Sequence, residues 1–138
     1  MAAFDAELQE ALYEILRGAT PALCGGRIYD SPPQADATKD DTAFPFIEIG
    51  ELQSLPDRTD DDDKGAESFV TLHIWSRYQG KAEIHRIASV LDDLLDGKSI
   101  AVAKRASAIA WIDQCLVMND PDGRTRHGIV TVRVIHRN

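Results

Sequence analysis

The first seventeen residues carry apolar side chains at steps of three and four, which is the spacing of one face of an amphipathic helix. The members of this stripe are Phe4, Leu8, Leu12 and Ile15. The pattern predicts a helix from about Ala3 to Arg17, with Gly18 in position to end it. Asp5 near the start and Arg17 near the end match the dipole of such a helix.

A second stripe at helical spacing lies between Lys81 and Asp96. Its apolar members are Ile84, Ile87, Val90, Leu91, Leu94 and Leu95. Gly97 stands directly after this segment, where a glycine commonly ends a helix. Each predicted helix is apolar on one side only, so each needs a sheet against which to bury that side.

Four other segments alternate between apolar and polar residues, as half-buried strands do. They span residues 44–52, 68–77, 108–118 and 128–136. The turn sequence Asp120-Pro121-Asp122-Gly123 separates the last two and predicts a hairpin. In the last segment Val130, Val132 and Val134 point to one face, which predicts that this face packs on helices while the other stays wet.

Two segments between the predicted strands lack an apolar period. Residues 31–43 contain two prolines, and residues 56–66 contain five aspartates whose burial would carry a large desolvation cost. We expect both to be exposed loops, the second joining two antiparallel strands. The order of elements then predicts a single α+β domain over residues 1–138, with a mainly antiparallel sheet of about four to five strands packed against two helices.

Composition narrows the class of protein. A chain of 138 residues with 43% hydrophobic residues suits one folded domain. Its net charge of -8 disfavours nonspecific binding to nucleic acid or to an anionic membrane. No apolar run is long enough to span a membrane, and the acidic N-terminus is unlike a signal peptide. We therefore expect a cytoplasmic protein that grips neither DNA nor a membrane.

The charge is distributed unevenly along the chain. Between Asp30 and Asp63 eleven acids face two bases, a local net charge of -9, whereas the segment from Arg124 to the end holds four arginines and no acid. An acidic middle and a basic C-terminal segment suit head-to-tail contact between copies.

The aspartate run Asp60–Asp63 is the first candidate for a metal site, because clustered carboxylates suit hard cations. An EF-hand needs oxygen ligands at alternate positions, a glycine at the sixth and a glutamate at the twelfth, and four consecutive aspartates lack that spacing. We therefore interpret the run as a solvated loop and expect no metal site.

The remaining candidates for chemistry are equally unspecific. The four histidines are His73, His85, His127 and His136. No two of them have the spacing that brings two ligands onto one metal from a helix, and the cysteines Cys24 and Cys115 form no CxxC pair. No nucleophile motif and no phosphate-binding glycine loop is present, so we expect neither an enzyme nor a cofactor.

The segment 68–77 offers a candidate interface instead. Val70, Leu72 and Ile74 share one face of the predicted strand, and Phe69 and Trp75 project from the other. Two interpretations stay open: a second layer buries the two aromatics, or they form an assembly surface, where Trp, Tyr and Arg are enriched. The candidate interface residues are Phe69, His73, Trp75, Arg77, Tyr78, Arg124, Arg126 and Arg133.

Five segments in order resemble a known family. They are GGRIYDSPP, FPFIEIGE, VTLHIWSR, the helical EIHRIASVLDDLL that follows it, and DPDGRTRHGIVTVRV. Together they span nearly the whole chain, and the WSR-to-helix junction and the closing hairpin are the most specific parts. On these segments the chain resembles the tail-completion, or tail-terminator, proteins of long-tailed bacteriophages and gene transfer agents, long catalogued as a domain of unknown function.

This resemblance implies a structural protein with no catalytic residues. It implies a ring, a hexamer, that closes the head-proximal end of the tail tube. The implied partners are further copies of the chain, the tail tube protein and the head-tail connector or stopper protein. Such a ring is assembled in the bacterial cytoplasm and resides in the virion or gene transfer agent particle, at the junction of tail and neck.

The acidic loop gains a possible role in such a ring. If it lines the central channel, like-charge repulsion lets DNA pass without specific binding. The residues expected to face the lumen or a partner are Asp57, Asp60, Asp61, Asp62 and Asp63. Two alternatives stay open: another neck or minor tail component, and a small metal-dependent enzyme that uses Asp60–Asp63 with His73.

Overall fold

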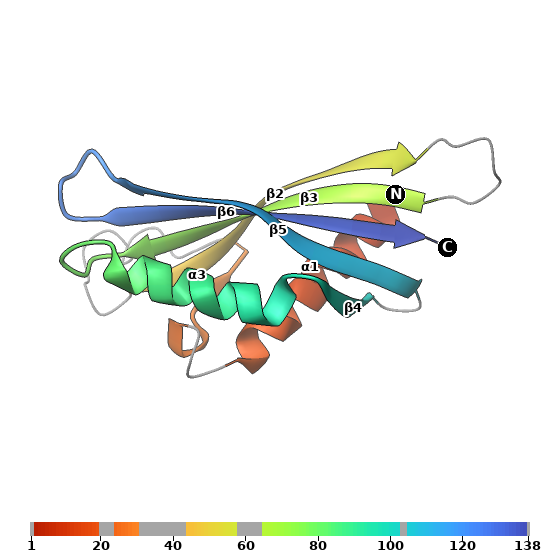
Figure 1. The fold of residues 1–138 in the computed structure, drawn as a ribbon, viewed down its shortest axis with the longest axis horizontal. Helices are drawn as coiled ribbons and strands as arrows, with labels where there is room; N and C mark the ends of the chain where they lie inside the picture. The colour runs from red at the N-terminus through yellow and green to blue at the C-terminus, as the bar shows by residue number, and fades with distance from the viewer. Residues whose placement is uncertain (1, 20–23, 31–43, 58–64, 103–104, 138) are drawn as a thin grey trace.

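The computed structural model describes residues 2–19, 24–30, 44–57, 65–102 and 105–137. They form a single α+β domain in which two helices lie beneath a six-stranded sheet (Figure 1). The elements are α1 (Ala2–Gly18), a short 3-10 turn (Cys24–Gly26), β1 (Ile28–Tyr29), β2 (Phe46–Asp57), β3 (Gly65–Ser76), α3 (Ala82–Leu95), β4 (Lys98–Val102), β5 (Arg105–Asn119) and β6 (Arg126–Arg137). The predicted fold class is confirmed.

The strand order in the sheet is β1-β2-β3-β6-β5-β4. Every pair is antiparallel except β1 with β2. The predicted hairpin between the last two long strands is confirmed, since all of β6 pairs with β5 from Ser107 to Asn119.

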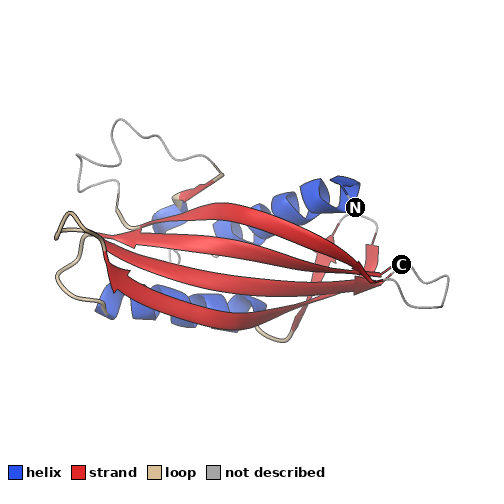
Figure 2. Cartoon of the chain, turned by 90° about the horizontal axis from the view of Figure 1, so that it is seen from above, coloured by secondary structure: helices blue, strands red, loops and turns tan. Residues whose placement is uncertain are grey.

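Both helices cover the same face of the sheet, as Figure 2 shows from the opposite side. Leu8, Leu12 and Leu16 of α1 are fully buried, as are Ile84 and Leu95 of α3. They form one buried cluster with the valines of β6 and the aliphatic face of β3, each burial contributing about 1.5–3 kcal/mol of transfer free energy. No helix of the described residues is long and apolar enough to cross a membrane.

The buried stripe of α1 includes one residue that the sequence analysis did not name. Leu16 is fully buried, whereas Ile15 only packs partly against the core. The steps from Phe4 to Leu8 and Leu12 are both four residues, and a further step of four reaches Leu16, so the buried stripe keeps that spacing along the helix.

The sheet has two strands more than the four that the alternation predicted. β1 pairs only two residues with β2, and β4 pairs four residues with β5. Both are too short to show a periodic pattern. Each lies at one edge of the sheet.

β2 and β3 also run further than predicted, into the segment 56–66 that was expected to be a loop. Pro56 and Asp57 pair with Ala66 and Gly65. A proline fits here because β2 has no partner strand on its other side at this level among the described residues. The centre of that segment, 58–64, and the whole of the predicted loop 31–43 lie outside the described residues.

Two β-bulges lie at one level of the sheet. β2 has an irregularity between Ile49 and Leu52, and β5 has one between Ile112 and Gln114. Both fall opposite the pair Thr71 and Thr131 of the two central strands. Because a bulge bends its strand and increases the local twist, both outer strands bend at the same height.

Candidate subunit interface

The face of the sheet opposite the helices is left without a covering layer by the described residues (Figure 2). We call it the open face. Burial along β3 alternates strictly: Val70, Leu72 and Ile74 are fully buried, whereas Phe69 and Trp75 are half-buried. The predicted division of this strand into two faces is confirmed. In the described part of the chain, the second layer that could have buried the aromatics does not exist.

Trp75 belongs to a group of rings on the open face that we call the aromatic cluster: Phe44, Phe46, His73, Trp75 and His127. The indole of Trp75 stacks on the imidazole of His127, with ring centroids 3.8 Å apart and planes 7° apart. Phe46 lies 6.4 Å from Trp75 on the other side, because it occupies the opposite position in β2. Three strands thus contribute to one cluster.

A row of hydrogen-bonded side chains, His127, His73 and Glu51, crosses the same cluster. Nδ1 of His73 lies 2.8 Å from Nε2 of His127, and Nε2 of His73 lies 3.2 Å from the Glu51 carboxylate. Burial, followed by the neighbouring His73, lowers the pKa of His127. Hydrogen bonds from its own backbone and then from His73 lower the pKa of Glu51. The cluster therefore favours the neutral form of His127 and the charged form of Glu51.

Gly50 makes room for the His73 side chain in this row. A Cβ atom at Gly50 would lie 2.7 Å from Cδ2 of His73, closer than real Cβ contacts come. His73 can approach β2 this closely because the bulged part of that strand has a glycine at this position.

Arg77 and Tyr78 follow the end of β3. The guanidinium of Arg77 lies 4.4 Å from the centroid of the Phe44 ring, and its Nε donates to Oγ1 of Thr125 at 3.3 Å. Tyr78 is 51% exposed, with the guanidinium of Arg86 6.0 Å from its ring. Arg77 thus extends the aromatic cluster, whereas Tyr78 projects from the end of the sheet.

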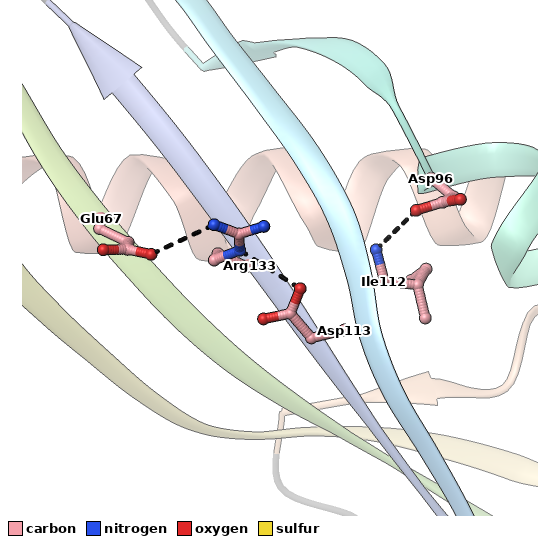
Figure 3. A network of polar contacts seen from close by, with 5 residues as sticks. All are labelled: Glu67, Asp96, Ile112, Asp113 and Arg133. Atoms are coloured by element: carbon pink, nitrogen blue, oxygen red, sulfur yellow. Dashed lines mark hydrogen bonds and ion pairs between the residues drawn. The ribbon is translucent and has the colours of Figure 1, made fainter.

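Arg133 lies at the other end of the open face, between β3 and β5 (Figure 3). Its Nε lies 3.2 Å from Asp113, and its Nη1 lies 3.6 Å from Glu67. These ion pairs are half-exposed and contribute little to stability. They do use the charge of Arg133 within its own chain, so Arg133 is not available as an unpaired cation for a neighbouring copy.

Arg124 and Arg126 lie at the turn between β5 and β6. Asp122 organises this turn, since its carboxylate accepts from the hydroxyl of Thr125 and from the backbone N–H groups of Arg124 and Thr125. These hydrogen bonds, led by the one from the Thr125 side chain, lower the pKa of Asp122 to about 2. The turn thereby presents Arg124 in an exposed position.

Asp57, the only acidic candidate among the described residues, lies at the opposite end of the sheet. Asp57 closes β2 and pairs with Gly65, whereas Arg126 pairs with Ser76 at the far end of β3. Asp60, Asp61, Asp62 and Asp63 lie outside the described residues. One copy therefore holds Asp57 and Arg126 apart, at the two ends of its strands.

Sequence reasoning missed a row of exposed apolar side chains on the open face. Ile109, Trp111, Leu116 and Met118 of β5 are 37–44% exposed, and Leu55 of β2 is 47% exposed. The signal was present in the sequence: β5 is apolar at both alternate sets of positions, which a strand with one wet face is not. Neighbouring exposed apolar side chains of this kind mark contact surfaces.

Nothing in the described residues forms a reactive centre. No group of three or more His, Cys, Asp or Glu side chains there could hold a metal ion. Burial raises the pKa of the Cys24 thiol to about 12, so this cysteine is held as the unreactive thiol. Cys115 is exposed, and burial of part of its side chain raises its pKa as well.

A helix-backed sheet with an uncovered face, an aromatic cluster and exposed apolar side chains on that face defines a structural subunit of a larger assembly. Residues 10–137 match the family described as tail completion protein gp17, and the chain belongs to this family. It is therefore a structural tail protein of a virion and not an enzyme, and it contacts other virion proteins. The metal-dependent enzyme left open by the sequence is excluded.

The fold is similar to that of a chain in the solved virion of a native gene transfer agent particle. The two chains superpose with a TM-score of 0.76 over 95% of each, at 19% sequence identity. No curated protein sequence matches this chain.

Proposed function

We propose that this chain forms a hexameric ring at the head-proximal end of a tail tube, where it ends tube growth and joins the tube to the head connector. The observation that carries the proposal is the open face: within a family of tail completion proteins, it exposes apolar side chains that only an assembled state would bury. Similarity of fold to a chain of a gene transfer agent particle supports the same setting.

The ring needs a heterologous contact, in which one patch meets a different patch on the next copy. The sheet supplies two unlike edges and two unlike ends, with Asp57 at one end and Arg126 at the other. The further partners of the ring are the tail tube protein on one side and the connector or stopper protein on the other. DNA passes through the ring without specific binding, in keeping with the net charge of -8.

Electron microscopy of purified protein mixed with tail tubes tests this function. We expect rings that cap one end of each tube, and tubes that stop lengthening once the protein is added. Density along the sides of the tubes, or tubes that grow unchanged, would instead identify another minor tail component and refute the proposal.

A separate variant tests the channel. Replacing Asp60–Asp63 with serine removes four negative charges, so we expect rings to form as before but DNA transfer by particles to fall. The control replaces the exposed Asp92 and Asp93 of α3 with serine. Unchanged DNA transfer with the Asp60–Asp63 variant would refute the role of this loop.

A further inference from the structure

The edge of β2 is only partly covered. β1 pairs with Ile47 and Glu48 alone, and no other strand of the described residues lies beside β2 on that side. Among the described residues, nothing therefore pairs with the backbone from Ile49 to Asp57 on this side, and it forms an uncovered edge. Pro56 lacks an N–H group to offer a further strand, which confines further pairing to Ile49–Leu55, a stretch that includes the bulge between Ile49 and Leu52.

The edge of β5 is covered at its other end. β4 pairs with β5 as far as Ala110, and the Asp96 carboxylate accepts the backbone N–H of Ile112 (Figure 3). In the described part of the chain no strand lies beside the rest of β5, from Asp113 to Asn119. Asp113, Gln114, Cys115 and Leu116 are all exposed in succession, so neither face of this stretch is covered within one copy.

We propose that these two stretches pair with each other between neighbouring copies: β2 from Ile49 to Leu55 in one copy adds antiparallel to β5 from Gln114 to Asn119 in the next. This inference rests on the proposed ring and names the contact that closes it. Edge strands are ready templates for such pairing, with backbone hydrogen bonds supplying affinity.

The direction of the strands fits this contact. β2, β3, β6 and β5 alternate in direction, so β2 and β5 run in opposite directions within each copy. In a ring whose copies are related by rotation about an axis along the strands, the β2 of one copy therefore meets the next β5 in the antiparallel sense. β1 and β4 do not obstruct it, because they cover the other parts of their edges.

The faces of the two strands also fit. Within one copy, Ile49 and Cys115 lie at the same level, through Leu72 and Val130. When the uncovered stretch of β5 in one copy is centred on that of β2 in the next, Asn119 lies at the level of Ile49. Neighbouring copies are then offset along the strands by about four residues, and each copy contributes four long strands. A stagger of about one residue per strand is what closed barrels have.

At this stagger Gln53 lies opposite Leu116 and both belong to the open face. Leu52 then lies opposite Val117, and both belong to the helix-covered face. An odd stagger would set open-face residues against helix-face residues, so the register is restricted.

Disulfide trapping tests the contact. In a background with Cys115→Ser, the pair Gln53→Cys and Leu116→Cys is placed on the open face. Within one copy their positions are separated by three strand spacings of about 4.8 Å and also lie at different levels along the strands, too far apart for a disulfide. Between copies they lie opposite each other. We expect oxidised rings to give a ladder of covalent oligomers on a non-reducing gel, reaching the full ring.

The control pair is Gln53→Cys with Trp111→Cys, which is equally exposed but lies five residues from Leu116 along β5. We expect no ladder from it, and no more than dimers from each single cysteine. Rings seen by electron microscopy without the Gln53–Leu116 ladder would overturn this contact while leaving the ring itself intact. An absence of rings, with or without tail tubes, would overturn the proposed function.

Discussion

Replacing Gly128 with alanine provides the sharpest test of how α3 is seated on the sheet. A Cβ atom at Gly128 would lie 2.6 Å from Cγ2 of Ile84 and 3.3 Å from Cβ of Ile74, whereas ordinary contact begins at 3.4 Å. The first neighbour is a fully buried side chain of α3, and the second is anchored in β3, so the helix has to move outward. Overpacking of this kind costs about 1–3 kcal/mol.

Alanine also restores part of this loss, since glycine within a strand costs about 0.5–1 kcal/mol in backbone entropy. The net expectation is a loss of about 0.5–2 kcal/mol. For a domain of this size that lowers the melting temperature by roughly 2–8 °C. Thermal unfolding followed by circular dichroism measures it.

Two controls make this test decisive. Gly18→Ala adds the same atom where nothing lies within 4 Å, so it should leave the melting temperature unchanged or raise it. In an Ile84→Ala background the cost of Gly128→Ala should shrink, because the clashing methyl group is gone. A Gly128→Ala protein that melts at or above the parent temperature would refute the packing argument.

Three further predictions concern the open face and the thiols. Trp75→Ala should weaken ring assembly, measured by light scattering, more than it lowers the melting temperature; the reverse result would make Trp75 a core residue. Because the pKa of His127 is lowered, the unfolded chain takes up a proton first on acidification, so stability should fall as the pH drops below about 6.5 and level off below the folded pKa. His127→Phe should flatten this slope, whereas the exposed control His85→Gln should keep it, and an equal slope in both would contradict the assignment. A thiol reagent at pH 8 should label one cysteine in the native protein, Cys115, and label Cys24 only after unfolding; two labelled native thiols would contradict the burial of Cys24.

Patterns within one element were readable from the sequence. The alternation in β3 depends on neighbours two residues away and the stripe in α3 on neighbours three or four residues away, and both predictions were correct. The ends of β2 and β3 were not readable, because five aspartates and Pro56 argue for a loop wherever pairing is unknown. Only the sheet order makes β2 an edge strand, on which a proline is tolerated.

The candidate interface could likewise be predicted only in part from the sequence. Trp75 and His73 were singled out because they share a strand face with each other. The two partners of His73, His127 and Glu51, come from β6 and β2 and lie 54 and 22 residues away from it in the sequence. Such pairs follow from the register between strands. The register depends on the bulge in β2, which the sequence alone does not reveal.

The paired bulges also bear on how this chain can vary in length. In a regular stretch of β2 or β5, losing one codon would invert the facing of every side chain beyond it. Between Ile49 and Leu52, and between Ile112 and Gln114, the bulged strand already has one residue more than its partner. Deleting one residue there removes the bulge, and the side chains that face the helices continue to face them. Such a deletion would straighten the outer strand. Descendants of this gene can therefore alter the curvature of the sheet at these two places without rewriting its core.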